Sequence, residues 1–551
     1  MTDFYEEMDE DERHEGFAYS HIANPKIITN ETWPEQTGPL KTNTVLQYDD
    51  NFQNVKSWGF PALAQRYNRR KNKNSRPVEL FKLHLIDMPE DQKTLLPEGL
   101  NYMKAITDYL CKLGEVSTVI KLVKTTIDTR WPQVEFYKHV LIILTVPVEF
   151  SEKKKGIMKQ CAHNAELIKS VTSPNLKIIT EPEAAAIYCM RSLNEFSMTK
   201  VGTSFLIVDI GGGTVDLTIR KLLPGNQLGE ITEQTGDSCG GSFVDKEFIS
   251  FLNRKVGKTA MNLVKDDHYG LLQYMVQEFC RVAKLPFTGE QKDFKTFELD
   301  LEELCPVLKE YVDDTTEKQM EKLEWVIDIE FEDVKGMFDP VIGRIIRLIR
   351  GQLDACKDCT AMFLVGGFSE SKYLRKRIKE EFGKKVPIIS SPDKPIAAIV
   401  RGALLYGLDT AVVKSRVLRY TYGIRSLPNW RPGDPVDRRT PDGKIFKFHT
   451  LVQRGKKVEV NQQVSDIFRV AYADQVDICM DIYVTRAYEV KYCDEPGVEL
   501  LGKFTINMPD KHLGLNRSVV YTLSFGETEI RATAKNKAGR EYHTTFELIF
   551  E

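Results

Sequence analysis

The chain lacks a strong net charge and any long apolar run. Its 76 Lys and Arg residues nearly balance its 79 Asp and Glu residues, for a formal charge of −3, so no overall field favours nucleic acid or an anionic membrane. No apolar stretch reaches the roughly 18 residues that a membrane-spanning helix needs. The acidic residues 1–14 are unlike a secretory signal and are expected to form a loose tail. We therefore expect neither nucleic acid nor a membrane as a partner.

A disulfide framework and a zinc-finger pattern are missing as well. Ten cysteines are scattered over 551 residues, which fits reduced thiols in a cytoplasmic protein better than a disulfide scaffold. Cys356 and Cys359 form the one close pair, and no second Cys or His pair stands at a zinc-finger spacing. We expect ordinary thiols at these two positions.

The most informative stretch is Phe205–Ile219. An apolar run leads into Asp209, then Gly211, Gly212, Gly213 and Thr214 follow, and apolar residues alternate with polar ones afterwards, which predicts a strand, a tight turn and a second strand. No Gly-Lys-Ser/Thr follows, so this is not a Walker P-loop. Glycines let backbone N–H groups approach an anion, and Asp209 is placed to hold a hydrated Mg²⁺. The pattern favours a phosphate-binding hairpin, with a purely structural glycine turn as the alternative.

Strands and helices alternate on both sides of this hairpin, which indicates α/β architecture. The expected strand at 139–147 is almost continuously apolar and should be buried on both faces. The other expected elements are a helix capped by Ser151, a strand at 176–180, a helix from Glu181 with Pro182 in its first turn, a helix after Gly240-Gly241, helices at 269–284 and 331–353, a strand at 361–365 before Gly366-Gly367, and a helix opened by Ser391-Pro392-Asp393.

From about residue 415 the helical periodicity disappears. Short alternating segments separated by turn residues take over, at 458–464, 476–484, 519–525 and 542–548. This pattern is typical of a β-sandwich of roughly 130 residues, which we expect to fold independently.

These pieces, in this order, resemble the 70-kDa heat-shock protein family, and most closely its divergent heat-shock twelve-A type branch, which has many fungal members. The matching segments are Leu144–Pro147 and Ile179–Ala186 for the first connecting segment, Ile207–Asp216 for the second phosphate motif, Met362–Ser369 for the adenosine motif, and Leu500–Phe504 for a strand of the peptide-binding sandwich. The resemblance implies an actin-like nucleotide-binding domain of two ribonuclease-H-like lobes at residues 15–414. A β-sandwich that binds peptides would follow at residues 415–551.

The resemblance also implies a site for ATP or ADP with Mg²⁺. Asp209 would hold the Mg²⁺ through water, Glu181 would position the metal shell or the attacking water, and Lys82 is either a γ-phosphate ligand or a surface lysine. The remaining implied contacts are Gly211, Gly212, Gly213 and Thr214 with the β- and γ-phosphates, Gly240 and Gly241 with ribose and phosphate, Lys284 in the adenine helix, and Gly366, Gly367 and Asp393 with the nucleoside. Arg281 stands where the family pattern expects an acidic residue.

Three departures from the family bear on activity. The family's first apolar strand and Asp-x-Gly-Thr-Thr loop would precede Gly16, and no Asp-x-Gly-Thr occurs upstream of that position. In place of a Leu-rich linker the chain has Ala411–Arg416, and no helical lid is expected after the sandwich. Either hydrolysis has been lost or the sequence is truncated at the N-terminus.

The sequence thus leaves three functions open. The first is an ATP-binding, chaperone-like protein with weakened or lost hydrolysis, which would act on extended peptides, with co-chaperones as further partners. The alternatives are an active ATP-hydrolysing chaperone and a nucleotide-sensing interaction scaffold. A sugar kinase of the same actin-like fold is disfavoured by the C-terminal sandwich.

Overall fold

A computed structural model describes residues 14–33, 35–63, 77–85, 93, 96–116, 134–191, 193, 196, 198–525, 530–536 and 541–544. Apart from His14, the expected acidic tail lies outside these residues. None of the described helices is long and apolar enough to cross a bilayer.

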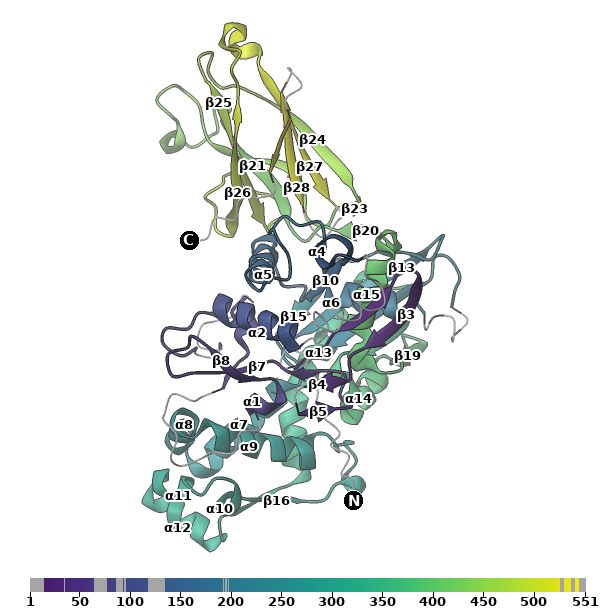
Figure 1. Ribbon diagram of the computed structural model, residues 1–551, viewed down its shortest axis with the longest axis vertical. Helices are drawn as coiled ribbons and strands as arrows, with labels where there is room; N and C mark the ends of the chain where they lie inside the picture. The colour runs from purple at the N-terminus through teal and green to yellow at the C-terminus, as the bar shows by residue number, and fades with distance from the viewer. Residues whose placement is uncertain are drawn as a thin grey trace.

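An eight-stranded mixed sheet, called here the central sheet, forms the middle of the molecule (Figure 1). Its strand order is β19 (Ile388–Ser390), β18 (Cys359–Val365), β12 (Ser204–Ile210), β13 (Val215–Leu223), β14 (Gln227–Glu230), β20 (Val413–Val417) and β23 (Lys457–Glu459), and β15 (Thr235–Asp237) also pairs with β13. The strand β12 is buried along its whole length, between antiparallel β13 and parallel β18. The predicted hairpin is therefore at the centre of the fold.

Helices cover both faces of the central sheet. Because successive side chains of a strand point to opposite faces, Leu206 and Val208 of β12 pack into one core while Phe205 and Ile207 pack into another. The first core is closed mainly by α7 (Ser242–Val256), α8 (Lys258–Asp267), α9 (Tyr269–Phe279), α13 (Phe331–Ala355) and α14 (Lys372–Phe382), and the second by α6 (Glu181–Cys189) and α15 (Ala398–Leu408). The first core also includes a smaller subdomain with α10 (Leu301–Leu304), α11 (Leu308–Tyr311), α12 (Asp314–Lys322), β16 (Phe297–Asp300) and β17 (Val326–Ile329).

The N-terminal region, residues 14–180, is built from small separate sheets. Its elements include β1 (His14–Glu15), β2 (Ala18–His21), β3 (Asn24–Thr29), β6 (Thr42–Asn43), β7 (Val45–Tyr48), β8 (Val55–Trp58), β9 (Val78–Glu79), the 3₁₀ turn η2 (Phe81–Leu85), α2 (Tyr102–Val116), α4 (Phe136–His139), β10 (Ile142–Val146), α5 (Glu152–Asn164) and β11 (Leu176–Thr180). Within the described residues β2 pairs only with β3, and β10 pairs only with β11. The sequence predicted burial of β10 on both faces. That prediction is wrong, because residues 142–145 are only half-buried.

The C-terminal region folds into two four-stranded antiparallel sheets, one ordered β22-β21-β25-β26 and the other β24-β27-β28-β29. Their bounds are β21 (Thr421–Ser426), β22 (Lys447–Val452), β24 (Gln462–Arg469), β25 (Asp477–Thr485), β26 (Val498–Asn507), β27 (Ser518–Phe525), β28 (Arg531–Asn536) and β29 (Glu541–Thr544). Alternate residues of these strands, among them Ile482, Val519 and Tyr521, pack together in one hydrophobic core. The alternating segments of the sequence thus form a β-sandwich, at the top of Figure 1.

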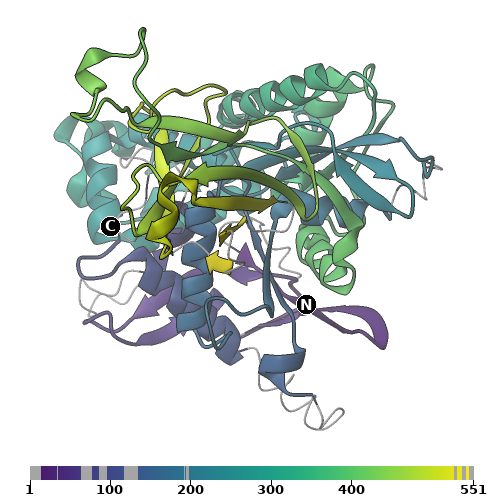
Figure 2. The same cartoon turned by 90° about the horizontal axis from the view of Figure 1, so that it is seen from above.

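One alternating segment does not form the single strand that its pattern predicted. Residues 458–464 are divided between β23 and β24 at Asn461, which has a positive φ of 63°. β23 pairs with β20, and β20 pairs with β14, so the central sheet extends into the sandwich region. The proposed domain boundary at residue 414/415 therefore lies inside β20. Seen from above, the strands of the sandwich lie over the rest of the chain (Figure 2).

Candidate functional site

The turn between β12 and β13 contains buried backbone donors that have no acceptor among the described residues. Asp209 pairs with Asp216 and Ile210 with Val215, and the turn closes where the Gly211 N–H donates to the Thr214 carbonyl at 3.0 Å. The N–H groups of Gly212, Gly213 and Thr214 donate no hydrogen bond to any described residue. Because a buried N–H is normally paired, three adjacent unpaired donors indicate a place for an anion.

The predicted glycine pair packs directly on this turn. The carbonyls of the three turn glycines each accept a hydrogen bond from the start of α7: Gly240 N to Gly213 O at 3.1 Å, Gly241 N to Gly211 O at 3.0 Å, and Ser242 N to Gly212 O at 2.8 Å. A Cβ on Gly240 would lie 2.4 Å from the carbonyl oxygens of both Gly211 and Gly212. A larger residue therefore does not fit at position 240 without displacing the turn.

The predicted nucleoside-contacting residues adjoin the same glycines. A Cβ on Gly241 would lie 3.2 Å from the Phe368 ring, so the segment after β18 borders the turn. Gly366 has φ +81° and donates its N–H to the Pro395 carbonyl at 3.3 Å. This contact brings Gly366 and Gly367 next to exposed Asp393, two residues before Pro395. The structure thus gathers three separate sequence motifs in one place.

Lys284 borders the region where the hairpin turn, the start of α7 and the Gly366 segment meet, and its side chain is buried. It ends a π-helical turn, Cys280–Lys284, and its Nζ forms a buried ion pair with Asp245 Oδ1 of α7 at 2.8 Å. The same Nζ is 5.9 Å from the centre of the Phe368 ring. Arg281, in contrast, pairs with Glu278 on the surface. Lys284 accordingly ties α7 to the helix that follows α9, beside the Gly366 segment.

Asp216 is a site residue that the sequence reasoning missed. It lies directly across the hairpin from Asp209, and both side chains are buried. The register was visible in the sequence, because the two aspartates stand symmetrically about the glycine turn. Burial and the nearby Asp209 carboxylate raise the pKa of Cys189, which places the last turn of α6 beside this pair.

The residues fit Mg²⁺–nucleotide. The described residues contain no group of three or more His, Cys, Asp or Glu side chains able to hold a metal. Mg²⁺ does not require one, because it is usually held by one or two carboxylates together with substrate phosphates and waters. Asp209 and Asp216 would supply the carboxylates, and the N–H groups of the turn would supply donors to phosphate oxygens.

Lys82 and Glu181 come together from different parts of the N-terminal half. Lys82 lies on η2, and its Nζ donates to Glu181 Oε1 at 3.2 Å, with side-chain exposures of 11% and 13%. The alternative that Lys82 is a surface lysine is therefore wrong. Glu181 begins α6, and α6 packs against β12 and β13. Glu181 thus lies on an element that contacts the hairpin, and it brings Lys82 of η2 next to that element.

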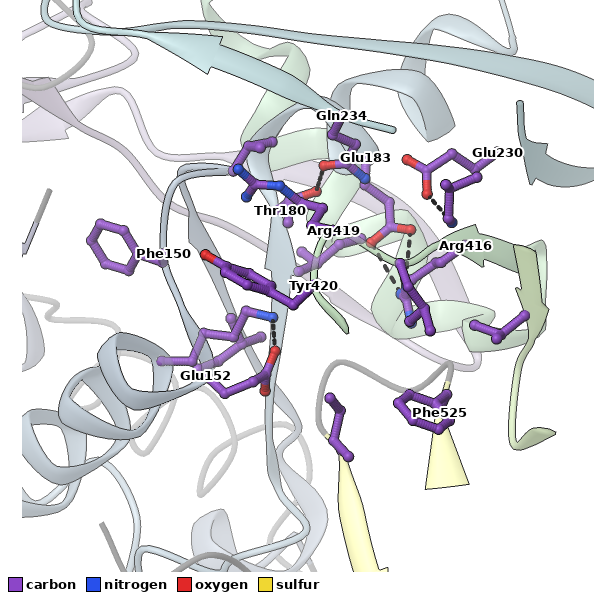
Figure 3. A pocket seen from close by; sticks show the side chains of 18 of the residues that line it. Phe150, Glu152, Thr180, Glu183, Glu230, Gln234, Arg416, Arg419, Tyr420 and Phe525 are labelled. Carbon is purple, nitrogen blue, oxygen red and sulfur yellow. Dashed lines mark hydrogen bonds and ion pairs between the residues drawn. The ribbon is translucent and has the colours of Figure 1, made fainter. Parts of the chain in front are cut away.

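A second buried ionic cluster lies at the junction with the sandwich, beside a cavity of about 110 Å³ (Figure 3). Arg416 of β20 donates to both oxygens of Glu183, each at 3.0 Å, and Arg220 is 3.4 Å from Glu183 and 3.1 Å from Glu230. The Val417 N–H also donates to Glu230 at 2.6 Å. Burial opposes ionisation of Glu183, but the charges of Arg416 and Arg220 outweigh it and lower the pKa of that carboxyl. The cluster fixes β20 in the central sheet.

Comparison with known proteins agrees with this architecture. The family model described as "Hsp70 protein" matches residues 137–474, which is more than half of the chain. The human "Heat shock 70 kDa protein 12A" is 25% identical over 479 residues, covering 74% of this chain and 68% of the relative. The human "Heat shock 70 kDa protein 12B" is 23% identical over 470 residues, covering 71% and 68%.

A more distant relative is the "Chaperone protein DnaK" of Picrophilus torridus. It is 24% identical over 330 residues, covering 58% of this chain and 48% of the relative. The resemblance stated from the sequence is thus confirmed, and so is the actin-like fold that it implied. The chain belongs to the Hsp70 family, as a divergent member of the heat shock 12A type.

Proposed function

We propose that this chain binds ATP and ADP with Mg²⁺ at the turn between β12 and β13. The observation that carries the proposal is the set of three N–H groups at Gly212, Gly213 and Thr214, beside buried Asp209, for which the described part of the chain offers no acceptor. Phosphate oxygens would accept from these donors, Asp209 would hold the Mg²⁺ through water, and the Gly366–Asp393 side would contact the nucleoside. Membership of the Hsp70 family supports nucleotide binding in general.

Calorimetric titration of Mg²⁺–ATP and Mg²⁺–ADP into the purified chain tests this proposal. Asp209→Asn should weaken binding about tenfold, because a hydrogen bond to a charged group contributes about 1.5–3 kcal/mol and ~1.4 kcal/mol corresponds to a factor of ten. Asp266→Asn is the matched control, because Asp266 is exposed on α8. Equal affinities for wild type and Asp209→Asn would remove Asp209 from the site.

Hydrolysis by this chain is proposed to be weak. Phosphoryl transfer depends on charge stabilisation from several sides of the phosphate, and the chain carries no Asp-x-Gly-Thr loop upstream of Gly16. Single-turnover hydrolysis by this chain should be negligible beside that of a chain extended before Gly16 by an apolar strand and Asp-x-Gly-Thr-Thr. Equal rates for the two chains would show that the described residues suffice for hydrolysis.

The sandwich is proposed to bind extended peptide segments at its end far from the nucleotide site. Two loops meet there, because β25 begins at Asp477 opposite Asn507, where β26 ends. They expose the apolar side chains Tyr472, Val476, Leu513 and Leu515. Buried Arg517 joins the loops by donating to the carbonyls of Gln475 and Met508, at 2.5 and 2.8 Å.

Peptide binding at these loops can be measured by fluorescence anisotropy with a labelled apolar peptide in extended form. Leu513→Ser combined with Leu515→Ser should weaken binding severalfold. Ile467→Ser is the control, because Ile467 is exposed at least as much as the two leucines but lies within β24 and not in the loops. An equal loss in both variants would contradict a site at the loops.

We propose a cytoplasmic location from the state of the cysteines, and co-chaperone partners from the family to which the chain belongs. All ten cysteines are free thiols, which supports a cytoplasmic location. Co-chaperones are proposed as further partners because the chain is an Hsp70-family member.

A further inference from the structure

Glu15 shares Lys82 with Glu181. The Nζ of Lys82 is 3.2 Å from Glu181 Oε1 and 3.5 Å from Glu15 Oε1. Lys82 and Glu181 are almost buried, whereas the Glu15 side chain is 32% exposed. Nothing in the sequence pattern had marked Glu15, which stands 67 residues before Lys82.

The backbone holds Glu15 in this position. β1 pairs antiparallel with β6, with Glu15 opposite Thr42. The next residue is Gly16, where a Cβ would lie 2.8 Å from the Leu40 carbonyl oxygen, so the chain runs close against that segment. Buried Tyr109 lies near both groups: burial and the charge of Glu15 raise its pKa, and the charge of Lys82 opposes that rise.

The three side chains leave an excess of negative charge. Two carboxylates face one ammonium group. Glu181 is in the first turn of α6, where the helix dipole favours a carboxylate. Glu15 has no such support from a helix, and its greater exposure makes it the more readily displaced partner of Lys82.

We propose that Glu15 competes with the γ-phosphate of ATP for Lys82 and thereby lowers the affinity for ATP relative to ADP. The proposal rests on the proposed nucleotide site and on Lys82 as its γ-phosphate ligand. ADP has no γ-phosphate and leaves the contact between Lys82 and Glu15 in place. A triphosphate must separate the two groups and also approach the Glu15 carboxylate.

Calorimetric titrations of the full chain with Mg²⁺–ATP and Mg²⁺–ADP test this proposal. Glu15→Gln should raise ATP affinity about three- to tenfold and change ADP affinity less than twofold. The reason is that the substitution removes one negative charge that would repel the γ-phosphate from several ångströms away, through an effective dielectric constant between that of a protein surface and that of water. Glu135→Gln is the control, because Glu135 also pairs with a lysine, Lys138, but at an exposed position far along the chain. Unchanged ATP affinity in Glu15→Gln, or an equal gain for both nucleotides, would overturn the proposal.

A double-mutant cycle shows whether Glu15 acts through Lys82. In a Lys82→Gln background, Glu15→Gln should improve ATP affinity by less than half of its effect in the wild type. An undiminished gain would mean simple repulsion and would contradict competition for Lys82. If the wild type binds ATP and ADP but Glu15→Gln has no effect, this inference alone fails. If the wild type binds neither nucleotide, the proposed function fails together with it.

Discussion

Glu181 and Glu183 stand two residues apart at the start of one helix, yet they belong to different ionic clusters. Residues two apart on a helix do not face each other. Glu181 contacts Lys82, in a cluster with two carboxylates and one cation. Glu183 contacts Arg416 and Arg220, in a cluster completed by Glu230.

The difference lies in charge balance and burial. The cluster around Glu183 has two carboxylates and two guanidinium groups. The side chains of Glu183, Glu230 and Arg220 are at most 3% exposed, and Arg416, which is 15% exposed, forms a bidentate pair with Glu183. This cluster pairs each carboxylate with an arginine and links α6 to β13, β14 and β20 of the central sheet, next to the sandwich. In the cluster around Glu181, two carboxylates contact Lys82 and one of them, Glu15, is 32% exposed, which is where we propose that a phosphate competes. One end of α6 thus supports both the architecture and the proposed nucleotide site.

The largest effect is expected from Arg416→Met. Removing one partner of a buried ion pair costs about 3–5 kcal/mol, because the other charge stays buried. The midpoint of urea unfolding should fall accordingly. The double variant Glu183→Gln, Arg416→Met should regain most of that stability. A midpoint within error of the wild type for Arg416→Met would show that the cluster is dispensable.

The same variant should alter the pH dependence of stability. In the wild type the pKa of Glu183 is lowered, so its contribution is present above the unfolded carboxyl pKa of about 4.3 and is lost only as the pH falls through the lower folded value. Without Arg416 the folded pKa should rise. The stability deficit of Arg416→Met should then be largest near pH 7 and shrink towards about pH 5. A deficit that is constant between these pH values would contradict this account of Glu183.

A smaller effect is expected from Gly240→Ala. The added Cβ would meet two carbonyl oxygens of the turn at 2.4 Å, which should cost about 1–3 kcal/mol and weaken nucleotide binding more than it lowers stability. Gly336→Ala is the matched control in the second turn of α13, where a Cβ meets no atom within 4 Å. It should be stabilising by about 0.5–1 kcal/mol. The stability of both variants can be measured by urea unfolding and their nucleotide affinity by calorimetry. If Gly240→Ala and Gly336→Ala gave the same results, close packing of Gly240 would be refuted.

The smallest effect is expected from Arg486→Ala. Arg486 contacts Glu149 across the same junction at 3.0 Å, but the arginine is half-exposed. An exposed ion pair contributes at most about 1 kcal/mol, and its contribution should decrease further in salt. A loss comparable to that of Arg416→Met would remove the distinction between buried and exposed pairs at this junction.

Local chemistry made the glycine turn between β12 and β13 predictable. Three consecutive glycines after an apolar run specify a turn, and alternation specifies the strand that follows. Those rules located β12, β13 and the glycine pair at 240–241, and the family resemblance indicated that Gly366 and Asp393 would join them.

Contacts between residues that are far apart in the sequence could not be predicted in this way. Arg416 reaches Glu183 across 233 residues, and Glu15 reaches Lys82 across 67. No periodicity links such positions. β23 alternates like its neighbours in the sandwich, yet it joins the central sheet because a positive φ at Asn461 separates it from β24. The apolar run of β10 suggested full burial, but burial depends on neighbouring strands that the run does not specify.

The most direct test of the central claim is hydrogen exchange at the turn. The account predicts that Mg²⁺–ADP slows exchange in a peptide covering Phe205–Ile219, because the N–H groups of Gly212, Gly213 and Thr214 acquire phosphate acceptors, and that Asp209→Asn reduces this protection. Peptides from the sandwich core should change far less. Unchanged exchange at the turn under saturating Mg²⁺–ADP would contradict the assignment of this hairpin as the phosphate site.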